Sequence, residues 1–155
     1  MPLKEIHDEN EFLALLEQEP VDFESMRHWI EQEFKAGRRE AVDGSAELFQ
    51  ATLAERGLAD QALLILRIRA AHHPDPEVFR KTCEQEAMAV VGPSPDDRAM
   101  VLSAGFGEEI PLDECFQRLE LLRALKPGTL CYDATWGAGT VHGTDGFYKK
   151  VTIDF

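Results

Sequence analysis

The chain has 155 residues, of which 44% are hydrophobic and 29% are charged, an ordinary composition for a globular protein with one main core. Its formal net charge is −13, from 29 acidic and 16 basic residues. No apolar run approaches the roughly 20 residues that a membrane-spanning helix needs, and the N-terminus lacks a signal peptide's basic and apolar regions. The sequence therefore predicts a cytoplasmic protein without membrane contact.

The negative charge is unevenly distributed along the chain. Residues 126–155 hold three acidic and three basic residues, so the whole excess lies in residues 1–125. A region with this potential repels phosphate backbones, which argues against nucleic-acid binding by that part of the chain. The charge suits a basic protein partner, but solubility alone explains an acidic surface equally well.

Residues 1–125 are predicted to form a helical domain, because apolar residues recur there at spacings of three and four. Proline and glycine separate the segments. The expected helices span residues 3–19, 21–36, 39–56, 59–73, 77–91, 94 or 96–104, and 111–125. The short loops predict antiparallel neighbours in a solenoid-like array or an irregular bundle, with hairpins over residues 39–73 and 76–104. There is no 34-residue period, so a tetratricopeptide array is not supported.

Several residues could carry chemistry, but each has a simpler explanation. His72 and His73 are adjacent and would point about 100° apart on a helix, so they make a poor metal site. Three isolated cysteines fit small buried side chains, because they show no metal-ligand spacing. A basic group is expected to be a solvated face that balances nearby carboxylates; it comprises Arg67, Arg69, Arg80 and Lys81. We therefore predict no catalytic, metal or cofactor-binding residues, and no enzyme activity.

Residues 126–155 are predicted to form a separate small β module. Glycines punctuate β-branched and aromatic runs at 128–135, 138–142 and 147–155, which indicates three antiparallel strands with a turn at 143–146. Strands that curl in this way are typical of SH3-like barrels, which need about five strands. The module is therefore expected to be incomplete, either because the chain is a fragment or because another chain completes the barrel.

Three motifs resemble a known family. Leu125-Lys-Pro-Gly128, Trp136-Gly-Ala-Gly-Thr-Val141 and Val151-Thr-Ile-Asp-Phe155 are similar to a pattern in the N-terminal extensions of some bacterial GreA/GreB-type transcription elongation factors. The preceding segment, Ile110-Pro-Leu-Asp-Glu-Cys-Phe-Gln-Arg-Leu119, also looks like its counterpart in those factors. Related curled modules occur in polymerase-binding proteins of the CarD and UvrD type. The resemblance covers the last third of the chain.

The resemblance implies a non-catalytic region that helps a factor associate with RNA polymerase. The chain lacks the family's long coiled coil, so no transcript-cleavage residues can be carried over. The contact candidates are Trp136, Phe147, Tyr148, Lys149 and Lys150. Strand alternation predicts that the last three are exposed, whereas Trp136 and Phe147 could instead fill the core of the sheet.

Two other functions remain open from the sequence. The chain could be a helical-repeat adaptor in another protein complex, with its β segment packed on the scaffold. An enzyme with a site between helices is the third reading, and no catalytic motif supports it. The sequence makes no prediction about oligomeric state.

Overall fold

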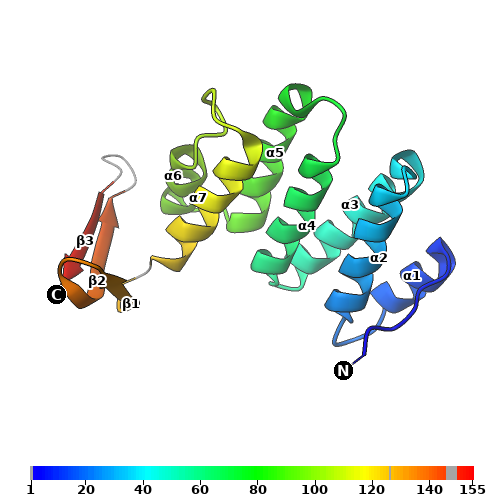
Figure 1. Ribbon diagram of the computed structural model, residues 1–155, viewed down its shortest axis with the longest axis horizontal. Coiled ribbons are helices and arrows are strands. Elements are labelled where there is room, and N and C mark those ends of the chain that lie inside the picture. Colours follow the sequence, from blue (N-terminus) through cyan, green and yellow to red (C-terminus); the bar gives the residue numbers. More distant parts are fainter. Residues whose placement is uncertain (1, 126, 146–149) are drawn as a thin grey trace. The chain divides into compact units, whose positions relative to one another are not determined.

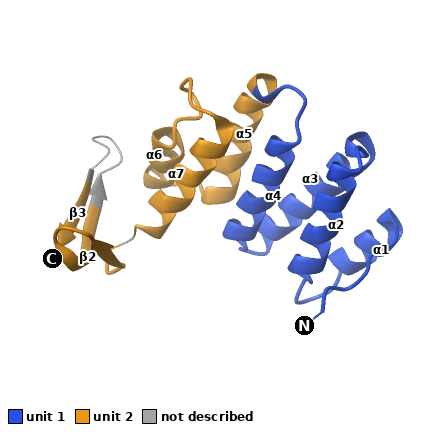
Figure 2. Cartoon of the chain, viewed as in Figure 1, with its two compact units in different colours: residues 1–76 blue, residues 77–155 orange. Residues whose placement is uncertain are grey.

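The computed structural model describes residues 2–125, 127–145 and 150–155 (Figure 1). These residues form seven α-helices followed by a three-stranded antiparallel sheet, which confirms the predicted fold class of a mainly helical chain with a small β module. The chain divides into two compact units, residues 1–76 and 77–155 (Figure 2). The proposed domain boundary between residues 125 and 126 stays a prediction.

The first unit is a stack of four helices. In chain order these are α1 (Glu9–Leu16), α2 (Phe23–Lys35), α3 (Arg39–Glu55) and α4 (Ala59–Ala71). Helix α3 is in contact with the other three, and most extensively with α4, which confirms the predicted hairpin over residues 39–73. The core holds an aromatic cluster in which the ring of Phe12 stacks on Trp29 at 4.8 Å and meets Phe49 edge-on at 5.6 Å. These contacts join α1, α2 and α3.

Helix α1 begins six residues later than predicted. The side chain of Asp8 accepts a hydrogen bond from the backbone N–H of Glu11 at 2.9 Å, and Glu11 in turn accepts from the N–H of His7 at 2.8 Å. An acidic residue followed three positions later by glutamate is a helix-start signal, so the sequence did contain the correct boundary. Residues 2–7 instead run as an extended strap.

The turns from α2 to α3 and from α3 to α4 use the same device twenty residues apart. Gly37 and Gly57 have φ values of +80° and +76°, and the next residue in each case donates to a carbonyl five residues back. This is the Schellman arrangement, which ends a helix at a left-handed glycine. The repeated geometry keeps the connections short, and it places successive helices antiparallel.

Arginines of the first unit have structural roles, and the expectation of a solvated basic face is wrong for Arg69. Its side chain is only 3% exposed; it donates to Gln50 at 2.8 Å and pairs with Asp43 at 3.2 Å, which links α4 to α3. Arg56 donates to the backbone oxygens of Leu16 and Gln18 at 2.8 and 2.9 Å. These carbonyls follow the end of α1, where no intrahelical donor is available.

The second unit begins with α5 (Pro76–Val91), α6 (Pro95–Ser103) and α7 (Leu112–Ala124). Ser94 caps α6, since its side chain accepts from the N–H of Asp97 at 3.1 Å, which decides between the two expected starts. The most extensive backbone contact among these helices is between α6 and α7, and not between α5 and α6 as predicted. The segment between α6 and α7 contributes the buried Phe106, which meets Phe116 edge-on at 5.2 Å.

Arg80 of α5 holds this α6–α7 segment in place, so a solvated role is wrong for it as well. The side chain is 14% exposed and pairs with Glu77 at 3.1 Å. Its guanidinium also donates to the backbone oxygens of Phe106 and Ile110. A planar fork with five donors can satisfy several acceptors in fixed positions, which a lysine cannot do.

The sheet consists of β1 (Leu130–Asp133), β2 (Gly137–Asp145) and β3 (Lys150–Asp154) in the order β1-β2-β3. Both pairings are antiparallel, and an irregularity lies between Val141 and Gly143 of β2. The predicted turn at 143–146 is wrong for its first three residues, because β2 continues through Asp145. The fourth lies outside the described residues.

Replacement of Arg80 by lysine tests this structural role. We expect Arg80→Lys to lower the free energy of unfolding by about 1–3 kcal/mol, because buried carbonyl oxygens lose their donors. Chemical denaturation followed by circular dichroism measures the change. Arg98→Lys, at an exposed position of α6, is the matched control and should stay within about 0.5 kcal/mol of the wild type. Equal stability of the two variants would contradict the role of Arg80.

Candidate protein-interaction surface

A tight turn presents Trp136 at one end of the sheet. Asp133 accepts hydrogen bonds through Oδ1 from the N–H groups of Thr135 and Trp136, at 2.8 and 2.9 Å. The following Gly137 has a φ of +81°, which an L side chain rarely adopts. The turn leaves Trp136 71% exposed, although aromatic side chains of this size are usually largely buried.

Leu130 and Tyr132 of β1 lie on one face of the sheet, because alternate residues of a strand share a face. They are 82% and 78% exposed, and no described residue covers them. On the opposite face Val141 is 1% exposed, and it is the one fully buried side chain among those described in the sheet. The module thus has a small core on one face and uncovered apolar side chains on the other.

Phe155 lies close to Trp136, with ring centroids 6.4 Å apart. This approach depends on Gly139, where an added Cβ would lie 2.9 Å from the backbone oxygen of Asp154 and from side-chain atoms of Ile153 and Phe155. Phe155 is still 57% exposed. Trp136 and Phe155 therefore form a second exposed apolar group at the turn end of the sheet.

The outer edge of β1 carries unpaired backbone groups. Val141 exchanges hydrogen bonds with Gly128 and Thr129, both at 2.8 Å. Because the bonds of an antiparallel ladder alternate, the N–H and C=O groups of Leu130 and Tyr132 point away from β2. No strand within residues 127–145 and 150–155 pairs with this edge. The edge and the exposed Leu130 and Tyr132 side chains are thus adjacent. We call Leu130, Tyr132, Trp136 and Phe155, together with this edge, the apolar sheet surface.

The structure describes two of the five predicted contact residues. Trp136 is exposed, so it does not fill the core of the sheet, which was the alternative. The backbone of Lys150 pairs with Asp145 at the start of β3, and nothing is described of its side chain. Phe147, Tyr148 and Lys149 lie outside the described residues.

Three members of the apolar sheet surface were missed by the sequence analysis: Leu130, Tyr132 and Phe155. Alternation along residues 130–133 signals that Leu130 and Tyr132 share a face. Alternation does not tell which face is covered, since that depends on how many strands pack against it.

The other candidates for chemistry have structural surroundings. His72 stacks on Phe34 with centroids 4.9 Å apart, and Nδ1 of His73 accepts from the N–H of Asp75 at 3.0 Å. Cys83 and Cys115 are buried, as expected, whereas Cys131 is half-buried. Burial raises the pKa of the Cys115 thiol despite the opposing effect of Arg80, so it stays protonated at neutral pH.

No group of three or more His, Cys, Asp or Glu side chains that could hold a metal ion occurs within the described ranges. Within the same ranges, no helix is both long and apolar enough to cross a bilayer.

Comparison with known proteins gives no relative. No family model matches the sequence, and neither the curated proteins nor the solved structures contain a significant match. Inferences about function therefore depend on the surfaces described above and on the sequence resemblance.

A substitution at Gly139 tests the close approach of β3 to β2. We expect Gly139→Ala to displace residues 153–155 and to destabilise the sheet by about 1–3 kcal/mol, because two of the three crowded contacts lie on the facing strand. Hydrogen exchange of the β2 and β3 amides measures the effect. Gly143→Ala lies on the same strand with nothing within 4 Å of its Cβ, so its amides should exchange at nearly wild-type rates. Unchanged protection in Gly139→Ala would contradict the proposed packing.

Proposed function

We propose that this chain is a non-catalytic protein-interaction region of a transcription elongation factor, and that it helps the factor associate with RNA polymerase. The observation that carries the proposal is the apolar sheet surface. Its four side chains are each more than half exposed, and they lie on one small sheet. Isolated exposed apolar residues are common, whereas a group of them on one element is typical of a binding surface.

The composition of this surface favours a protein partner. Tyrosine and tryptophan are enriched among the residues that contribute most to binding in protein interfaces. Burying a large apolar side chain contributes about 1.5–3 kcal/mol, so two or three of them could supply most of the affinity of a transient complex. The net charge of −13 disfavours contact with nucleic acid, which leaves the polymerase protein as the target.

The resemblance to GreA/GreB-type extensions supplies the identity of the partner. Two of the three motifs that carry it coincide with the sheet: one runs from Trp136 into β2, and the other covers the end of β3 through Phe155. The exposed Trp136 and Phe155 belong to these motifs.

Binding to RNA polymerase can be measured directly. We expect the purified chain to bind bacterial core RNA polymerase, and Tyr132→Ser with Trp136→Ser to weaken binding at least tenfold, since each removes an exposed aromatic contact. The fold should persist because both side chains are exposed. A second variant with alanine at Tyr148, Lys149 and Lys150 tests the contacts expected from the sequence.

The control is Leu121→Ser, which removes a 59% exposed apolar side chain from α7. This control should bind like the wild type. Wild-type affinity in both β-module variants, or no binding of the wild-type chain, would refute the proposal.

A helical-repeat adaptor is the second candidate, and the repeated turns at Gly37 and Gly57 favour it. Identical connections twenty residues apart are characteristic of stacked helical units, which present extended surfaces to partners. This candidate predicts that the partner binds the helices. Substitutions in the sheet would then leave complex formation unchanged.

A further inference from the structure

The negative charge of the first unit is concentrated at its beginning. Residues 2–24 hold eight acidic residues and a single basic one, Lys4, whereas residues 25–76 hold eight acidic and seven basic residues. The eight are Glu5, Asp8, Glu9, Glu11, Glu17, Glu19, Asp22 and Glu24, and all except Asp22 are exposed. The strap and α1 therefore form the most acidic part of this unit.

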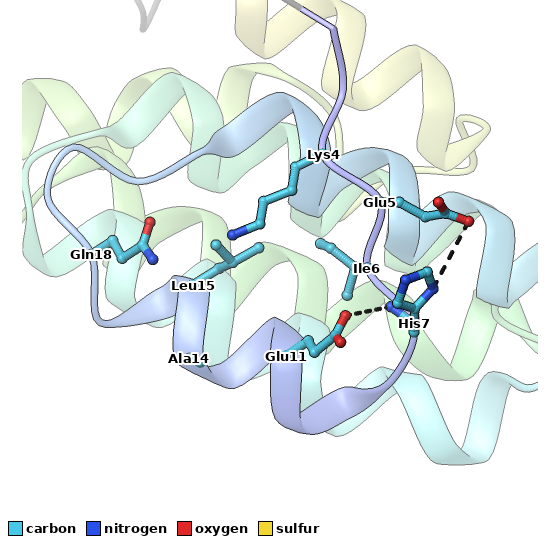
Figure 3. A pocket seen from close by; sticks show the side chains of 8 residues that line it. All are labelled: Lys4, Glu5, Ile6, His7, Glu11, Ala14, Leu15 and Gln18. Atoms are coloured by element: carbon cyan, nitrogen blue, oxygen red, sulfur yellow. Dashed lines mark hydrogen bonds and ion pairs between the residues drawn. The ribbon is translucent and has the colours of Figure 1, made fainter.

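A hollow of about 280 Å³ lies between the strap and α1 (Figure 3). Its apolar lining comes from Ile6 and Leu15, which are 9% and 3% exposed, and from Ala14. Its polar lining consists of Lys4, Glu5, His7, Glu11 and Gln18. The hollow thus combines an apolar floor with a rim that carries two carboxylates.

Hydrogen bonds fix the strap at both ends of the hollow. The N–H of Lys4 donates to Oγ of the buried Ser25 in α2 at 2.7 Å. At the other end the N–H of His7 donates to Oε2 of Glu11, and Asp8 caps α1. The hollow is therefore held open by the fold, and a ligand would not have to order the strap.

Two charged groups at the hollow lack partners. Glu11 uses Oε2 for the strap, and its Oε1 has no partner among the described residues. Lys4 makes no ion pair with a described residue, and Figure 3 shows its side chain lying across the hollow beside Leu15. The ammonium group of Lys4 thus lies where an external cation would experience the same carboxylates.

We propose that this hollow binds a lysine or arginine side chain from an extended basic segment of a protein partner. The methylene stem of such a side chain would lie on Ile6 and Leu15, and its cationic end would reach Glu11 and Glu5. Long basic side chains bury their stems on apolar surface while their charge stays at a polar rim. A cleft with acidic walls also concentrates cations, which raises the association rate. The site is separate from the apolar sheet surface and does not depend on polymerase binding.

Opposite effects of two substitutions test the site. Binding of a fluorescently labelled, blocked peptide of alternating lysine and leucine can be followed by anisotropy at physiological salt. We expect Glu11→Gln to weaken binding about two- to fivefold, because a carboxylate contact is lost while the amide oxygen can still accept from His7. Lys4→Met should strengthen binding by a similar factor, because it removes the competing cation and preserves the stem.

Three controls separate this site from general attraction. Glu40→Gln removes an exposed charge elsewhere in the unit and should leave affinity unchanged within about 1.5-fold, since distant charges are screened. The same peptide with glutamate in place of lysine should not bind. The Tyr132→Ser, Trp136→Ser variant should bind the peptide normally.

Several results would overturn the assignment. These are no saturable binding by the wild type, equal weakening by Glu11→Gln and Glu40→Gln, no gain from Lys4→Met, or loss of peptide binding in the sheet variant.

Discussion

A sheet of three strands has two faces and cannot cover both of them with its own side chains. In this chain the face that carries Val141 forms a small core, and the bulk of Leu130 and Tyr132 is left on the other face. The close approach at Gly139 draws Phe155 toward Trp136, which adds a second exposed group. The proposed function follows from this imbalance, since apolar side chains that the sheet does not cover gain most from a partner that does.

The helices meet the opposite constraint, because their acidic surface must still enclose polar groups at helix ends and in loops. Arginines do this at several places: Arg56 satisfies carbonyls after α1, Arg69 joins α4 to α3, and Arg80 holds the segment before α7. Removing one partner of such a buried contact costs more than the contact itself contributes, because the other group is left without water or protein. The helical units are therefore stabilised by cations that an acidic composition makes scarce.

Local sequence signals predicted much of this structure. Spacings of three and four located all seven helices, and glycines located three strands, because both signals act within a few residues. The start of α1 was missed although Asp8 and Glu11 mark it, since apolar residues such as Ile6 extended the periodic pattern into the strap. The roles of Arg69 and Arg80 could not be predicted, because their partners lie 19 to 35 residues away in the sequence. The exposure of Leu130 and Tyr132 likewise depends on the number of strands and not on local pattern.

The most direct test of the account is the footprint of RNA polymerase on this chain, measured by hydrogen exchange of the backbone amides in the free and bound states. The account predicts that the added protection is centred on residues 130–136, where the outer edge of β1 and the turn present their unpaired groups. Protection confined to the helices, with residues 130–136 exchanging as in the free chain, would contradict it.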